Sequence, residues 1–422
     1  MKDSIRFISN LVFVLLLFTI LFSYAMFQGG FVSWFLFYSF LPILVYHFGL
    51  LFYPMKNWEV TRKLSKHVVQ AGDDVTVILQ LERSFPFPLY YCVFEEIIPS
   101  SLKKKDNKHH KYHFMDQPEL LQENRSVKRI MFVGFRKKVD IPYTMEQLPR
   151  GEHHLQAVRI LTSDVLGIVK KEHVFPLKDE VVVHPNEREL SLREGISSFE
   201  QGSTAVNTFH LENTNVATGV RDYAPGDRFS WIHWKQTAKS NTVMTKEFEQ
   251  ERSTDLLLVL DACASKRSNP LAFEATVEMT LSLIGQLERS AIDVGLLSIG
   301  KETMHFPMNQ DSMMKERMKN FLTKVQPDGE RAFPILLKEK IRSVERADMI
   351  LILTTNIDDF FRQTIQELKH RSAHVVVYYI QSSRFVYRKE KEIISQMKKE
   401  GTAIHHLTEK ELAETPLEVS IK

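Results

Sequence analysis

Cysteine is nearly absent from this chain, whose 422 residues include only two. Cys92 and Cys263 lie far apart, without the paired spacing of a zinc site or the dense pattern of a disulfide scaffold. This scarcity excludes a small secreted domain stapled by disulfides, and it agrees with a reducing compartment.

Sequence signatures of catalysis are missing as well. The chain has no phosphate-binding loop of the P-loop type, no Gly-x-Ser-x-Gly nucleophile, no His-Glu-x-x-His helix and no Cys-x-x-Cys pair. The net charge of +3 is too small to indicate a general nucleic-acid binder. These absences favour a protein that is not an enzyme and has no nucleic-acid partner.

Charged residues are absent from Phe7 to Met55, a run of 49 residues. That length is more than twice the ~20 residues with which one helix crosses a bilayer. Gln28, Gly29 and Gly30 interrupt the run near its middle. The sequence therefore predicts a transmembrane hairpin in residues 1–56, with helices at about 7–27 and 31–53. We expect His47, in the second span, to be packed or near a headgroup rather than on a proton path.

Basic residues flank both ends of this run. Lys2 and Arg6 precede it, and four more follow it: Lys56, Arg62, Lys63 and Lys66. The positive-inside rule then places both termini and the soluble domains in the cytoplasm, as parts of a multi-pass protein of the cell membrane. A cleaved leader is the alternative, because residues 23–25 resemble a cleavage site, but the second apolar stretch would still be long enough to span.

Residues 57–185 have the pattern of an antiparallel β-sandwich. In GDDVTVILQLE the apolar Val75, Val77, Leu79 and Leu81 recur at every second position, as in a strand with one buried face. Several further short strand-like runs follow. The loop Lys103–His113 contains three histidines and is interpreted as solvated; a metal site and a contact with anionic headgroups are the alternatives.

Residues 253–422 alternate between strand-like and helix-like segments. DLLLVLDA is a continuous apolar run that ends at Asp261, as a buried parallel strand does. A helical face with Phe273, Val277, Leu281 and Ile284 follows, and KETMHFPM has the pattern of a strand that pairs back as a hairpin. The alternation predicts a doubly wound α/β sheet, whose ligands bind at the carboxyl ends of its strands.

Residues 186–252 connect these two domains and contain the stretch RDYAPGDRFSWIHWKQTAKS. Pro225 and Gly226 suit the centre of a type II turn, after which Asp227 can bond to nearby backbone or to a basic neighbour. Its aromatic residues predict an arm packed against the α/β sheet, and its polar residues predict a partner-binding surface. The two interpretations share one set of residues: Arg221, Tyr223, Pro225, Gly226, Asp227, Trp231, Trp234 and Lys235.

This stretch resembles the signature of a bacterial family, domain of unknown function 58, which has Arg-x-Tyr-x-Pro-Gly-Asp followed by Ile-x-Trp. RGEHHLQAVRILTSDVLGIV is similar to the family's sandwich strand and its Asp-x-x-Gly turn. The chain departs from the family at Ser230 and His233, where members often have Arg and Asp. The resemblance implies a membrane-tethered companion of MoxR-type AAA+ ATPases, with a transglutaminase-like membrane protein as a further partner.

The α/β domain resembles a von Willebrand factor A domain, which implies a divalent-ion site at Asp261 and Ser265. A cysteine, Cys263, stands where that family has its first serine. Thiols are poor ligands for Mg²⁺, which prefers hard oxygen donors. Thr355 occupies the position expected to hold an acid, although Asp358 and Asp359 follow closely. We therefore expect a degenerate site and no cofactor, with Mg²⁺ as the alternative.

The sequence thus predicts a membrane-anchored scaffold or adaptor that docks protein partners. The alternative is a Mg²⁺-dependent hydrolase or phosphoryl-transfer enzyme that uses Asp261, Ser265 and Asp227.

Overall fold

A computed structural model gives the fold in two compact units. The first comprises Met1–Lys111 and Gln117–Asn186, and the second comprises Tyr112–Asp116 and Glu187–Lys422. The structure describes residues 2–123, 125–165, 167–193, 217–224, 229–240, 242–248, 255–265, 268–290, 292–308, 312–344, 347–370 and 374–420.

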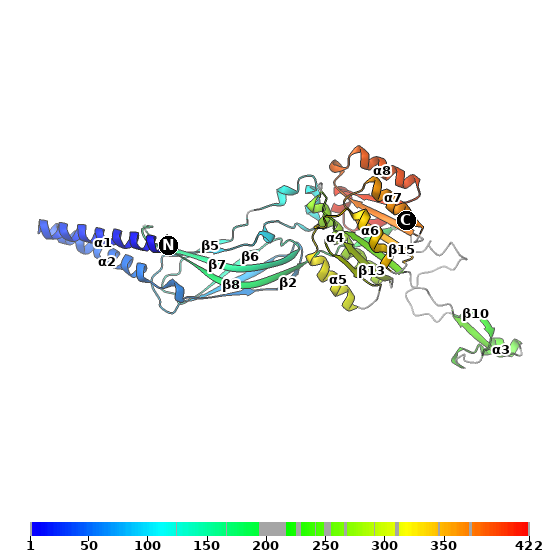
Figure 1. Cartoon of the computed structure of the whole chain (residues 1–422). Helices are drawn as coiled ribbons and strands as arrows, with labels where there is room; N and C mark the ends of the chain where they lie inside the picture. The colour runs from blue at the N-terminus through cyan, green and yellow to red at the C-terminus, as the bar shows by residue number, and fades with distance from the viewer. Residues whose placement is uncertain are drawn as a thin grey trace. The chain divides into compact units, whose positions relative to one another are not determined.

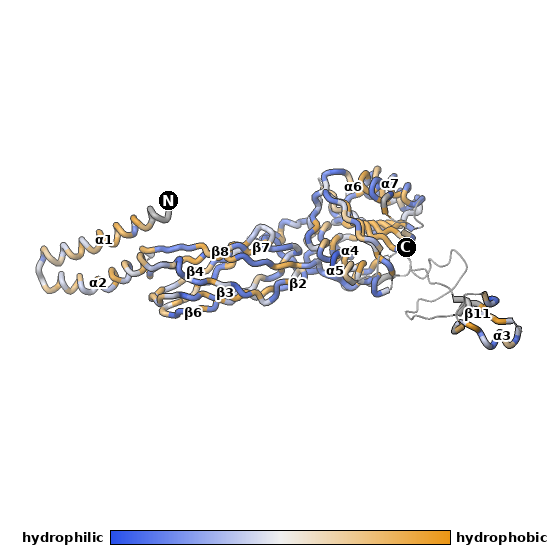
Figure 2. Tube along the Cα trace, turned by 60° about the horizontal axis from the view of Figure 1, so that its bottom comes forward, coloured by the Kyte–Doolittle hydropathy of each residue, from blue (hydrophilic) through white to orange (hydrophobic). Residues whose placement is uncertain are grey.

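The first unit begins with two antiparallel helices, α1 (Lys2–Gln28) and α2 (Phe31–Phe52), which run side by side (Figure 1). Gly29 turns the chain between them at φ +62°, a left-handed conformation that glycine adopts without strain. Phe37 packs against Phe18 and Phe22 across the hairpin. Both helices are long and apolar enough to cross a membrane, and hydrophobic residues run along each of them (Figure 2). The two predicted apolar helices are confirmed.

Two β-sheets form the rest of the first unit. A three-stranded antiparallel sheet contains β1 (Glu59–Leu64), β3 (Val75–Glu82) and β6 (Lys138–Met145). A five-stranded sheet has the order β2 (Val68–Gln70), β8 (Lys170–His184), β7 (Gly151–Ser163), β4 (Tyr91–Glu96) and β5 (Lys128–Met131), with β2 and β8 parallel. Short 3-10 turns complete it: Met55–Asn57, Ser100–Leu102 and Pro118–Leu121, with Lys108–Phe114 running into the second unit.

The two sheets share one hydrophobic core, which contains the inward residues of β3, β6, β4, β7 and β8. The four apolar residues predicted to alternate along β3 are all buried in it, while the residues between them are exposed or half-buried. This confirms the period-two pattern.

A buried polar network crosses this core. Arg62 donates to Glu96 Oε1 at 2.6 Å, and Tyr143 donates its hydroxyl to Glu96 Oε2 at 2.6 Å. Burial raises the pKa of Glu96, while the Arg62 guanidinium and the Tyr143 hydroxyl counteract the rise. The carboxyl is therefore tolerated inside the sheets because both of its oxygens have partners.

The histidine-rich loop lies at the far end of β3 from helix α2. Asp106 accepts from Lys111 at 2.5 Å and its backbone N–H donates to the Gln147 carbonyl, beside the start of β3. The turn that follows α2 instead meets the other end of that strand, where Ser84 donates to Asn57. This position argues against the headgroup contact that the sequence left open for Lys103–His113.

The second unit is built on a six-stranded sheet. Its order is β14 (Thr303–Phe306), β13 (Asp293–Ile299), β12 (Asp255–Asp261), β15 (Met349–Thr354), β16 (His374–Ile380) and β17 (Ala403–Leu407). Five strands are parallel, and β14 pairs back on β13 antiparallel, as predicted. A separate strand pair joins β9 (Leu190–Arg193) to β18 (Leu417–Ser420).

Helices cover this sheet between its strands. They are α4 (Pro270–Arg289), α5 (Ser312–Lys324), α6 (Phe333–Lys340), α7 (Asp359–Lys369), α8 (Arg388–Lys399) and α9 (Glu409–Ala413), with 3-10 turns at Ile341–Ser343 and Ser383–Phe385. Helices α6, α7 and α8 share a core with one set of alternating strand residues, which includes Leu257, Val259 and Ile352. The architecture is the predicted mixed α/β arrangement.

Helix α4 is buried along most of its length and receives the segment Tyr112–Asp116, which belongs to this unit. Tyr112 donates its hydroxyl to Glu278 Oε2 at 2.5 Å, and both side chains are buried. Asn269, the N-cap of α4, donates its amide to the Met115 carbonyl at 2.6 Å. A segment distant in sequence thus satisfies the polar groups of a core helix.

Replacing Arg62 by Met tests the buried network of the first unit. The variant leaves the Glu96 carboxyl without its cation, and we expect a loss of roughly 3–5 kcal/mol in the free energy of unfolding near neutral pH. Because burial raises the pKa of Glu96, its folded state holds a proton more tightly than the unfolded chain. The loss should therefore shrink as the pH falls and Glu96 becomes neutral. Denaturant unfolding of the full chain in detergent measures both effects.

The double variant Arg62→Met, Glu96→Gln is the matched control, because it removes the charge that Arg62 neutralises. Most of the lost stability should return in it. An equal loss at every pH, or a double variant as unstable as the single one, contradicts the ion-pair account.

Candidate functional site

The carboxyl edge of the six-stranded sheet holds the predicted ion-site residue Asp261, at the end of β12. Its Oδ1 accepts from the Cys263 backbone N–H at 3.0 Å, and its Oδ2 lies 2.6 Å from Thr354 Oγ1 at the end of the neighbouring strand β15. Asp261 is 4% exposed. Burial raises its pKa to about 7, against the opposing hydrogen bonds from Thr354 and Cys263.

The hydrogen bonds around Thr354 agree with a neutral Asp261. The single hydroxyl proton of Thr354 has two acceptors, Asp261 Oδ2 and the Asn356 carbonyl at 2.9 Å, while the Asn356 N–H donates to Thr354 Oγ1. If Asp261 carries a proton, it donates to Thr354 and Thr354 donates to Asn356, so every group has a partner. An ionised Asp261 would compete with the carbonyl for one proton.

Cys263 contributes a protonated thiol to this edge. Burial raises its pKa to about 12, and the nearby Asp261 carboxyl adds to the rise. The Sγ atom donates to the Ile299 carbonyl at 3.5 Å. A thiol held in this form is neither a nucleophile nor a good ligand for a hard cation.

A loop closes over the same edge. Gly329 donates to the Ala262 carbonyl and accepts from Ala264 at 2.7 Å. A Cβ at Gly329 would lie 2.9 Å from the Gly300 carbonyl carbon, so only glycine permits this close approach. The loop therefore lies against residues 262–264, directly after the strand end where an open α/β sheet binds its ligands.

The other residues considered for a metal have different roles. Asp358 is the N-cap of α7 and accepts from the Phe361 N–H at 2.6 Å, and Asp359 pairs with Lys389 at 3.4 Å. The backbone carbonyl of Ser265 accepts from the Ser268 N–H at 3.0 Å. With a protonated thiol and a carboxyl whose oxygens are both engaged, the described residues do not fit a Mg²⁺ site.

The family stretch forms a small β-hairpin with a helix. Strands β10 (Ala217–Asp222) and β11 (Met244–Phe248) pair antiparallel, a 3-10 turn spans Phe229–Trp231, and α3 (Trp234–Ser240) follows. The buried Ile232 bridges to Thr245, which is also buried. We call residues 217–224 and 229–248, apart from residue 241, the signature module.

His233 explains one of the departures from the family pattern. Its Nδ1 accepts from the Gln236 N–H at 3.1 Å, three residues into the helix. This is the N-cap interaction that an aspartate makes at the same position. The change from Asp to His therefore preserves the start of α3.

Trp234 corrects the prediction that the aromatic residues of the stretch are packed. It is 67% exposed, and α3 has no buried residue. Trp231 and Tyr223 are half-buried, Lys235 is exposed, and the exposed Arg221 donates to the Asp222 carbonyl. The predicted turn residues Pro225, Gly226 and Asp227 lie outside the described residues.

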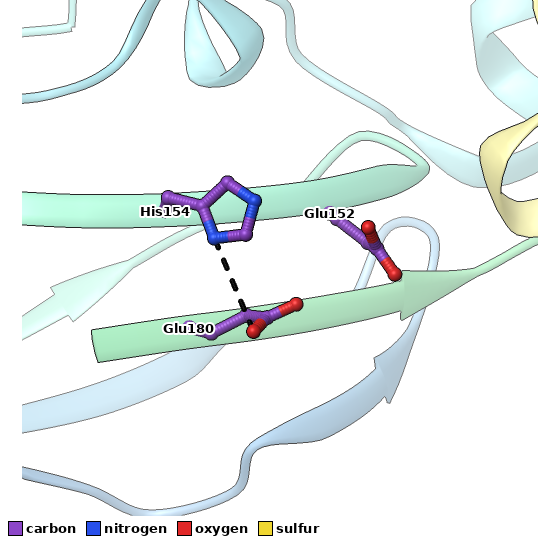
Figure 3. A group of neighbouring side chains, drawn as sticks. All are labelled: Glu152, His154 and Glu180. Atoms are coloured by element: carbon purple, nitrogen blue, oxygen red, sulfur yellow. Dashed lines mark ion pairs between the residues drawn. The ribbon is translucent and has the colours of Figure 1, made fainter. Parts of the chain in front are cut away.

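Sequence reasoning missed a cluster of three possible metal ligands on the five-stranded sheet (Figure 3). Glu152 and His154 lie two residues apart on β7, and Glu180 is opposite His154 on β8. His154 Nδ1 lies 3.9 Å from Glu180 Oε2, which is an ion-pair distance, longer than two ligands of one zinc ion show. Only the strand register brings the three together, and the sequence alone does not reveal that register.

Replacing Asp261 by Asn tests its protonation state. The amide mimics the neutral acid: it accepts from Cys263 and donates to Thr354. In the original protein the folded state keeps a proton that the unfolded chain loses above its ordinary pKa of 3.8, so stability falls as the pH rises to about 7. The amide side chain of the variant does not titrate, so the variant does not lose stability over this pH range. Above about pH 7 it should be more stable than the original protein, by at most ~4 kcal/mol.

Urea unfolding of the full chain at about pH 5 and about pH 8 measures the gain, which should be larger at the higher pH. Asp328→Asn, which changes an exposed carboxyl on the covering loop, is the control and should show no such difference. A gain for Asp261→Asn that is independent of pH would sink the assignment.

Comparison with known proteins places the signature module and the sheet in one family. The model of the family described as protein of unknown function DUF58 matches residues 219–384. The uncharacterized protein YeaD of Bacillus subtilis (strain 168) is 35% identical over 345 residues, covering 81% of this chain and 82% of YeaD.

Solved structures give only distant similarities. The PilB minor pilin from Streptococcus sanguinis is 7% identical, with a TM-score of 0.30 over 76% of this chain and 84% of that one. A non-cellulosomal cohesin from Archaeoglobus fulgidus is 14% identical, with a TM-score of 0.17 over 28% and 91%. The sequence relationships are the informative ones, and by them the chain belongs to the DUF58 family and is a relative of YeaD.

Proposed function

We propose that this protein is a membrane-anchored scaffold or adaptor that captures a protein partner through the signature module. The observation that carries the proposal is the exposure of two aromatic side chains of the module, Trp234 and Phe229, the second of which is 77% exposed. The module itself is folded, because its Ile232 and Thr245 are buried. Large aromatic side chains in solvent are unfavourable unless a partner covers them, and tryptophan is enriched among residues that dominate binding energies.

The second unit supports a docking role of the von Willebrand factor A type. Its sheet has five parallel strands, with β12 as one of the two central strands, and β14 is an antiparallel strand at one edge. This strand order is compatible with that fold. The closed strand end around Asp261 favours docking over a catalytic or metal-dependent role, so the hydrolase and phosphoryl-transfer alternative has no support from the described site.

The partner that we propose is a MoxR-type AAA+ ATPase, with a transglutaminase-like membrane protein as a second member of the assembly. The support is the family relationship. We further propose that α1 and α2 both cross the cell membrane and that the termini and both units lie in the cytoplasm. The basic residues on both flanks of the hairpin support this orientation.

Trp234→Ala tests the docking role. Because Trp234 is exposed, its loss should leave thermal unfolding nearly unchanged, within about 1 kcal/mol. Removing a binding hot spot should weaken capture of a purified MoxR-type ATPase by ~2 kcal/mol or more, which is roughly 30-fold in Kd. Biolayer interferometry with the full chain in nanodiscs measures the affinity.

Phe360→Ala is the matched control, since Phe360 is an exposed aromatic residue on α7 of the same unit. It should bind the ATPase like the original protein. If both variants bind with the same affinity as the original, the signature module is not the docking surface.

A reporter fused after Lys422 tests the orientation. We expect it to be active in the cytoplasm and accessible to cytoplasmic labelling, because the basic residues follow the positive-inside rule. A protected reporter, or a mature chain shortened by a leader, would reverse the assignment.

A further inference from the structure

We propose that one end of the first unit inserts into the interface of the bilayer that α1 and α2 span, a proposal that depends on the membrane anchoring proposed above. We call this end the loop end. It is formed by the β3–β4, β5–β6 and β7–β8 loops, and its exposed apolar residues are Phe85, Tyr90, Phe132, Phe135 and Val165.

The carboxyl end of α2 packs on the sheets of the first unit rather than on lipid. His47 Nε2 lies 2.9 Å from Asp164 Oδ2, in the β7–β8 loop, and both side chains are buried. Lys171 donates to the carbonyls of Leu50, Leu51 and Tyr53, at 3.2, 2.9 and 2.6 Å. One face of the last turns of the helix, with His47, Leu50 and Leu51, is therefore buried against the unit.

The other two loops reach the same helix end. Tyr53 donates its hydroxyl to the Phe85 carbonyl at 2.7 Å, and Phe87 stacks on Tyr46. The β5–β6 loop joins the β3–β4 loop through a backbone pair between Leu89 and Gly134, and the rings of Tyr90 and Phe132 meet at 5.5 Å. All three loops thus lie beside the end of α2.

Helix length places this end at membrane depth. The 22 residues of α2 span roughly 33 Å, which matches a hydrocarbon core of ~30 Å. If the bilayer ended before His47, residues 31–46 would provide only roughly 24 Å. A span of full length therefore needs the packed turns of α2, and the loops around them, to enter the interface.

The composition of the loop end fits lipid as its occupant. Aromatic and aliphatic side chains partition into the interfacial region, and basic residues nearby attract anionic headgroups. Four exposed basic residues belong to this end: Lys56, Arg136, Lys137 and Lys170. The buried Arg83 donates to the carbonyls of Phe87, Gly134 and Arg136, so two of the loops share one anchoring side chain.

Depth-dependent fluorescence tests the proposal. Phe132→Cys, in a Cys263→Ser background, is labelled with an environment-sensitive NBD probe in the full chain, reconstituted in vesicles with anionic lipid. Cys92 is buried and does not compete for the label. We expect blue-shifted emission that is lost when shallow doxyl-labelled lipid is included. Leu120→Cys is the matched control, because Leu120 is 63% exposed, like Phe132 at 65%, and belongs to the part of the unit near the histidine-rich loop.

Emission and quenching equal to those of the Leu120→Cys control overturn the proposal. A blue shift without quenching by doxyl lipid also overturns it, because the loop end is then covered by protein. Alkaline carbonate extraction of the same vesicles separates the two proposals: a chain that is extracted is not anchored, whereas a retained chain without quenching contradicts the loop insertion alone.

Discussion

The ammonium group of Lys171 satisfies the backbone carbonyls at the end of α2, and the arrangement of the first unit depends on this interaction. The last four carbonyls of a helix have no intrahelical partner, and they need other donors. Lys171, from β8, donates to the carbonyls of Leu50, Leu51 and Tyr53, of which Leu50 and Tyr53 also accept from backbone N–H groups. Burial lowers the pKa of Lys171, and the carbonyls replace part of the water that its ammonium loses. Hydrogen bonds thereby join the end of α2 to the five-stranded sheet.

Local patterns predicted the elements well, because their causes are local. The uncharged run, the alternation along β3 and the apolar run that ends at Asp261 each reflect the environment of neighbouring residues. Contacts between distant residues were not predictable. His47 was expected to be packed or near a headgroup, and its partner Asp164, 117 positions away, was not foreseen. The strand register alone brings Glu180 to His154. Those pairings depend on how loops close, which periodicity does not encode.

The candidate sites differ in what the sequence could reveal about them. The position of Asp261 at a strand end followed from the pattern, but its raised pKa comes from burial in the folded unit, against the opposing hydrogen bond from Thr354 in a different strand. For Trp234 the sequence did not predict even whether the side chain is buried or exposed. An aromatic-rich stretch suits a buried joint and an exposed docking surface equally, so composition did not distinguish them. His233 shows that a departure from a family pattern can preserve a hydrogen bond, here an N-cap.

The membership of Tyr112–Asp116 in the second unit has an evolutionary consequence. A gene segment that begins at Glu187 encodes this unit without Tyr112 and Met115. The Tyr112 hydroxyl, which donates to Glu278, and the Met115 carbonyl, which accepts from Asn269, are then missing. Recombination at that boundary would transfer an α/β unit whose core helix has lost one hydrogen bond at Glu278 and one at Asn269, although Asn269 keeps its bond to Gln381. A breakpoint at Glu187 is therefore expected to weaken the transferred unit, because the residues that complete its core helix lie more than seventy positions upstream.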